Sequence, residues 1–136
     1  MSSLGYFASR LDRQQTRLER LSEALLVLRA WALGELTNLG ATEKELQTAQ
    51  SVASEFINEL LGALKSGEGD EDMKNIVTKI RDGRSPDTDW MQDLEETQRI
   101  LGSGRPLTEP LMERLREAVG MLRQQFAEGS NRIRPR

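Results

Sequence analysis

The sequence contains no cysteine and no histidine. Without cysteine the chain has no disulfides and no thiolate ligands for a metal, and it suits a reducing compartment, so the cytoplasm is the expected location. Without histidine it lacks the commonest general base, the serine–histidine–aspartate triad, histidine-based zinc sites and phosphorelay domains. We therefore expect no catalytic residues, no cofactor and no metal, in a protein that is not an enzyme.

Long apolar segments and an excess of positive charge are also missing. The longest apolar run, Ala24 to Gly34, contains Arg29 and is about half of the ~20 residues that cross a bilayer. The N-terminal segment carries charged residues where a secretory signal would be apolar. The formal net charge of −3 argues against whole-surface binding to nucleic acid but leaves open a local basic face. The sequence thus predicts no membrane partner.

The composition favours helices. Of the 136 residues, 37% are hydrophobic and 30% charged, so apolar residues are scarcer than in most globular chains and long solvated helix faces are expected. No segment alternates between apolar and polar residues as a strand does. The predicted fold class is all-α: a bundle of about five helices in a single domain over residues 1–128, followed by a basic C-terminal tail over 129–136.

Apolar residues in the first segment recur at alternating steps of three and four, as in a heptad repeat. This spacing predicts one long helix from about Gly5 to Leu36, with Gln14 as the polar member of the apolar stripe. The other predicted helices are shorter, so part of the stripe is expected to stay uncovered and to pack against another chain. The residues assigned to this self-association seam are Leu4, Phe7, Leu11, Leu18 and Leu21.

Signals for helix ends divide the rest of the chain. Thr42 and Glu45 form a capping box, which predicts the start of a second helix, and Gly67 is its expected left-handed stop. A third helix follows an acidic turn and ends at Gly83. Two further helices follow entries that contain proline, and the last of them has Thr108 as its cap.

A row of arginines is the most specific polar feature, because its spacing places four guanidinium groups on one helix face over about 15 Å. Three interpretations remain open: a solvated flank that pairs with acids of a neighbouring helix, contact with nucleic acid phosphates, and contact with an acidic protein partner. Two arginines of the tail extend this predicted partner or phosphate contact. The six residues are Arg10, Arg13, Arg17, Arg20, Arg132 and Arg134.

Two acidic clusters and two tryptophans suggest other chemistry. Asp70, Glu71 and Asp72 precede one helix, and Asp87, Asp89 and Asp93 open another. Either set of oxygens suits a hard cation, but neither has EF-hand spacing, and capping of the helix N-termini explains both. Trp31 and Trp90 are expected in the core rather than as platforms for base stacking.

These patterns favour a noncatalytic interaction or scaffold subunit that acts by self-association or by docking in a larger assembly. The alternative is a small nucleic-acid-contacting subunit of a ribonucleoprotein complex, comparable to an RNA-guided effector, that uses the arginine-lined face. An enzyme with carboxylates and a divalent metal is a third hypothesis. An inhibitor has the same composition as a scaffold, so the sequence does not separate the two.

Overall fold

The computed structural model describes residues 3–83 and 87–133, with side chains described for 11–83 and 89–129. These residues form six helices and no strand. The helices are α1 (Ser3–Ala32), α2 (Leu36–Leu39), α3 (Glu43–Ser66), α4 (Glu71–Asp82), α5 (Asp87–Ser103) and α6 (Glu109–Ile133). The all-α prediction is confirmed, with one short helix, α2, that the sequence did not predict. No helix within the described ranges is long and apolar enough to cross a bilayer.

The first helix ends earlier than predicted, at Ala32 instead of about Leu36. Gly34 adopts a left-handed backbone conformation with φ of +70°. Its amide donates to the Trp31 carbonyl, and the Glu35 amide donates to the Ala30 carbonyl at 2.7 Å. These two bonds form a Schellman motif, which satisfies the last carbonyls of α1 and turns the chain into α2.

Both predicted signals around α3 are confirmed. The Thr42 hydroxyl accepts from the Glu45 amide, and the Glu45 carboxylate accepts from the Thr42 amide, so the capping box is complete. At the other end Gly67 has φ of +68°, and its amide donates to the Ala63 carbonyl. At the end of the chain, α6 continues through Gly129, the predicted start of the tail, to Ile133.

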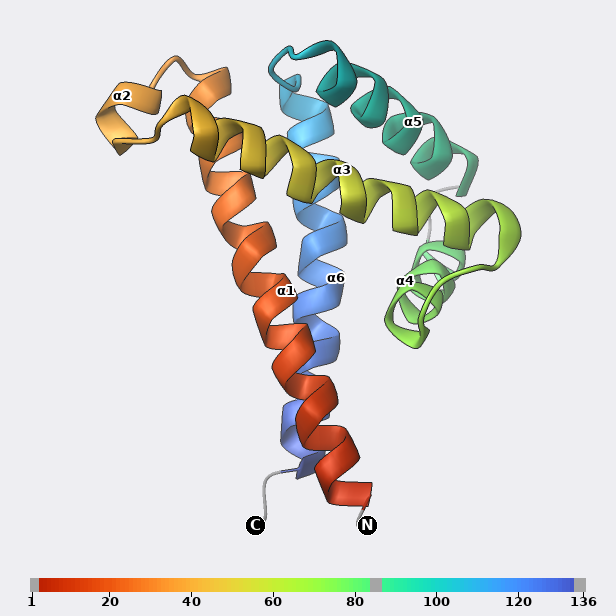
Figure 1. Ribbon diagram of the computed structural model, residues 1–136. Coiled ribbons are helices and arrows are strands. Elements are labelled where there is room, and N and C mark those ends of the chain that lie inside the picture. Colours follow the sequence, from red (N-terminus) through yellow and green to blue (C-terminus); the bar gives the residue numbers. More distant parts are fainter. Residues whose placement is uncertain (1–2, 84–86, 134–136) are drawn as a thin grey trace.

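The helices α1 and α6 run antiparallel, side by side along the long axis of the molecule (Figure 1). Leu18, Leu21 and Leu28 on α1 and Leu115 and Leu122 on α6 are buried in the core. The helix α3 starts near the C-terminal end of α1 and diverges from it, packing against α1, α4 and α5. The fully buried Ile57 and Leu60 of α3 complete the core.

A buried polar contact joins α1, α4 and α6. The Gln14 amide nitrogen donates to Asp72 Oδ1 at 2.7 Å, and the Gln125 amide nitrogen donates to the Asp72 main-chain oxygen at 3.2 Å. All three residues are buried. Buried polar groups need hydrogen-bond partners. Gln14, the polar residue of the predicted stripe, finds its partner at the start of α4 and so connects α1 to that helix.

This contact yields a testable prediction with a neighbouring control. Gln14→Ala removes a donor from a buried carboxylate and should lower the free energy of unfolding by about 1–3 kcal/mol. Gln15 is exposed and bonds only to Glu19 on its own helix, so Gln15→Ala should change stability far less. Urea unfolding followed by circular dichroism measures both. Equal effects would show that the buried bond contributes nothing beyond helix propensity.

Candidate functional site

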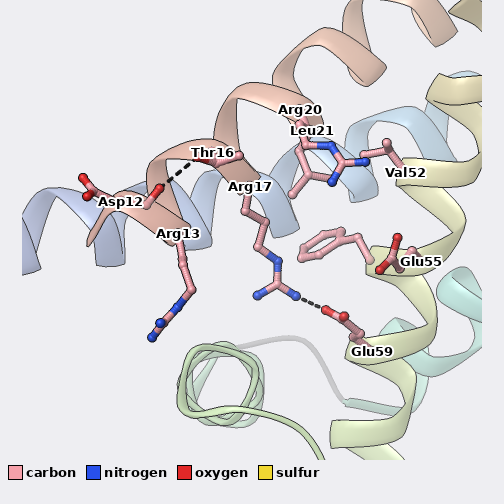
Figure 2. A pocket seen from close by; sticks show the side chains of 10 residues that line it. Asp12, Arg13, Thr16, Arg17, Arg20, Leu21, Val52, Glu55 and Glu59 are labelled. Carbon is pink, nitrogen blue, oxygen red and sulfur yellow. Dashed lines mark hydrogen bonds and ion pairs between the residues drawn. The ribbon is translucent and has the colours of Figure 1, made fainter. Parts of the chain in front are cut away.

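The arginine row lines a groove of about 350 Å³ between α1 and α3. Arg13, Arg17 and Arg20 come from α1, and Val52 and Phe56 of α3 supply apolar surface (Figure 2). These three arginines therefore share one face of α1, as their spacing in the sequence predicts. The side chains of Arg10 and Arg132, and the whole of Arg134, lie outside the described residues.

Arg17 reaches across this groove and pairs with acids of two other helices. Its guanidinium forms an ion pair with Glu59 on α3 (Figure 2) and a second one, at 3.3 Å, with Asp70 at the start of α4. The guanidinium also lies 5.9 Å from the centre of the Phe56 ring. With 23% of its side chain exposed, Arg17 is largely occupied by contacts within the chain.

Arg13 and Arg20 differ from Arg17 because both are exposed. Neither has an ion-pair partner among the described side chains. Their surroundings are nevertheless acidic, since the groove and the adjoining pocket next to α4 present six carboxylates to three arginines. These carboxylates are Asp12, Glu55, Glu59, Asp70, Glu71 and Asp72. A phosphate backbone that approaches the row would meet this negative charge as well.

The acidic clusters are engaged in contacts within the chain. Asp70 caps α4 by accepting from the Met73 amide at 2.9 Å, and Asp72 accepts from Gln14. Asp93 forms an ion pair with Arg114 at 2.8 Å, whereas Asp87 has no described side chain. No three carboxylates come together as a possible metal site among the side chains described.

The tryptophans lie in or beside the core. Trp90 is buried, and the Arg114 guanidinium lies 4.3 Å from its ring centre, held there by the same ion pair with Asp93. Trp31 is half-buried and packs against the core. The predicted core location therefore holds for Trp90, and its stacking face is covered by an arginine of the same chain.

The self-association seam packs within the chain wherever its side chains are described. Leu18 and Leu21 are buried in the core, and Leu11 is half-buried. A Cβ at Gly129 would lie 3.1 Å from Leu11 Cδ2, so α6 approaches α1 closely at this point. The helix α6 runs along α1, so the described part of the stripe has a neighbour within the chain. The side chains of Leu4 and Phe7 lie outside the described residues.

A different apolar surface is exposed instead, where α1, α2 and α3 meet. Leu26, Leu33 and Leu39 have 58%, 59% and 41% of their surface exposed, and they are the exposed large hydrophobic residues among the side chains described. Leu26 and Leu39 line one groove of about 390 Å³ together with Val27, Ala49 and Val52. We call these three leucines the leucine corner.

Little in the sequence predicted this exposed surface. Leu26 and Leu33 are seven residues apart, which places them on one helix face, and the Leu33 amide still donates to the Arg29 carbonyl at 3.0 Å. They lie beside an apolar stripe in a leucine-rich segment, so the sequence indicated only a broad buried face. The structure shows that Leu26 and Leu33, on this part of the face, remain exposed.

Comparison of the chain with protein-family models, with curated proteins and with solved structures finds no match.

Arg17 and Arg13 allow a direct test of the difference between a structural and an accessible arginine. Arg17→Ala removes two ion pairs and the contact with Phe56, and it should lower the free energy of unfolding by about 1–2 kcal/mol. Arg13→Ala, one turn away and exposed, should stay within about 0.5 kcal/mol of the unmodified protein. Chemical denaturation at low and high salt measures both, and the loss at Arg17 should shrink as salt rises. Equal stability of the two variants would contradict the structural role.

Proposed function

We propose that this chain is a noncatalytic helical subunit that acts by binding another protein chain through the leucine corner. The observation that carries the proposal is the exposure of Leu26, Leu33 and Leu39, two of which, Leu26 and Leu39, line one groove, while the other large apolar side chains described are buried or half-buried. Scattered single leucines on a surface need no explanation, but a contiguous apolar patch marks an interaction site.

The energetics support a protein partner. Burying one leucine side chain contributes about 1.5–3 kcal/mol, so covering three of them supplies several kcal/mol before any polar contact is added. The groove next to Leu26 and Leu39 is lined partly by Ala24, Ala41 and Ala49, which leave room for side chains of a partner. A hydrophobic centre surrounded by polar residues is the usual composition of such an interface.

The arginine row supports a nucleic acid partner less well. Arg17 already pairs with Glu59 and Asp70, and the remaining Arg13 and Arg20 lie next to further carboxylates. Affinity for nucleic acid depends on the number of phosphates that cations neutralise, and each neighbouring carboxylate opposes that gain. The row is better explained by the interpretation in which a helix flank pairs with acids of neighbouring helices.

The proposal predicts that a charge at the leucine corner abolishes partner binding without unfolding the chain. Tagged protein and its Leu26→Glu and Leu39→Glu variants are expressed in the native source, and retained proteins are quantified by mass spectrometry. At least one protein, which can be an untagged second copy of the chain, should be retained by the unmodified protein and lost from both variants. Asn75→Glu, which adds the same charge at an exposed site on α4, serves as the control and should retain it.

Two outcomes would contradict the proposal. Retention of the same proteins by both leucine variants would show that the corner is not the binding surface. Loss of salt-sensitive nucleic acid retention in an Arg13→Glu, Arg20→Glu variant, with the leucine variants unaffected, would favour the ribonucleoprotein alternative. Circular dichroism of every variant should show unchanged helix content, because all the substituted residues are exposed.

A further inference from the structure

The buried polar side chains gather around one helix, α4. Four polar side chains are buried in the described part of the chain, and three of them, Gln14, Asp72 and Gln125, meet where α4 begins. The fourth, Thr97, donates to the Asp93 carbonyl within α5. The docking of α4 onto the rest of the chain therefore buries polar groups as well as apolar ones.

Two of the polar atoms buried around α4 lack a hydrogen-bond partner. They are Nζ of Lys79, on α4 itself, and Oε1 of Gln125, whose nitrogen donates to Asp72, and they are the only such side-chain atoms in the described residues. A buried polar atom without a partner costs free energy, and the cost is larger for a charged group. A helix of 12 residues does not enclose the end of its own lysine side chain, so undocking of α4 returns Nζ to water. The cost of burying this atom therefore favours undocking.

The apolar attachment of α4 is smaller than that of the two helices on which it packs. The described residues include eight buried apolar side chains on α3 and six on α6, against four on α4. With 12 residues, α4 is also at the length where an isolated helix is marginal in water. The helix therefore depends on its contacts with α3 and α6 to stay folded.

The link between α3 and α4 has the properties of a hinge. It consists of residues 67–70, and two of them, Gly67 and Gly69, have φ of +68° and +114°. Glycine exchanges these conformations for others at little cost, and hinges are short segments that absorb such changes. The link thus permits α4 to move relative to α3 without disturbing the core of α3.

We infer that α4 is a detachable helix, which leaves α3 and α6 as one cooperative unit while the contacts of α1 with α3 and α6 persist. The docked state predominates, because Met73, Ile76, Val77 and Ile80 are buried in it. Undocking hydrates Lys79 Nζ and exposes this apolar face. The inference goes beyond the proposed function, since α4 lies on the opposite side of the molecule from α2 and contributes no residue to the leucine corner (Figure 1).

Hydrogen exchange of the full chain, followed by mass spectrometry of its peptides, tests the undocking. Amides of α4 should exchange at least about tenfold faster than the slowest amides of α3 and α6, because their exchange does not require unfolding of the whole chain. Their exchange should also respond less to urea below the unfolding transition, since undocking exposes less surface than global unfolding. Equal rates and equal urea dependence in the three helices would overturn the proposal.

A matched pair of lysine variants tests why α4 undocks. Lys79→Met keeps the apolar part of the side chain and removes the buried amine, so it should slow exchange in α4 at least about fivefold. Lys74 is exposed on the same helix, and Lys74→Met should stay within about twofold of the unmodified chain. Unchanged exchange of α4 in Lys79→Met, or an equal change in Lys74→Met, would reject the buried amine as a cause of undocking and with it the proposal.

Discussion

The antiparallel packing of α1 against α6 is the interaction on which the rest of the structure depends. The two longest helices contribute Leu18, Leu21, Leu28, Leu115 and Leu122 to the buried core, and each of the remaining helices contacts at least one of the two. Gly129 permits close approach near the chain ends, where a Cβ would lie 3.1 Å from Leu11 Cδ2 and the leucine side chain would have to shift slightly. Leu18, Leu21 and Leu28 of the apolar stripe are buried within the chain, so the described part of the stripe contributes to folding of the single chain.

Polar contacts determine where α4 sits on this pair. Apolar ridges alone permit helices to slide or rotate, whereas a buried hydrogen bond has one satisfied geometry. Gln14 and Gln125 both donate to Asp72, and Arg17 adds an ion pair with Asp70 at the cap of the same helix. The buried oxygen of the Gln125 amide has no hydrogen-bond partner, which costs free energy. These contacts are therefore better understood as fixing the position of α4 than as a large source of stability.

The sequence predicted what local physics determines. Helix spacing, the capping box of Thr42 and Glu45 and the left-handed Gly67 involve groups within a few residues of one another, and the structure has each of them. The partners of those helices depend on distant residues. Arg17 pairs with acids that are 42 and 53 residues away in the chain. Its spacing in the sequence therefore predicted its helix face but not its two ion-pair partners. The period of the seam likewise gave the direction of the apolar face without stating which helix covers it.

The leucine corner also shows the difference between what local sequence determines and what contacts between distant residues determine. Gly34 stops α1 while the apolar pattern continues, and α2, with four residues from Leu36 to Leu39, is too short to cover Leu26 or Leu33. Leu26 and Leu33, at 58% and 59% exposed, have gained less than half of the free energy that full burial would supply. The larger share of that free energy is not used by folding of the single chain. Under the proposed function it stabilises a complex, since the apolar surface that the fold leaves in water is the surface whose burial still remains.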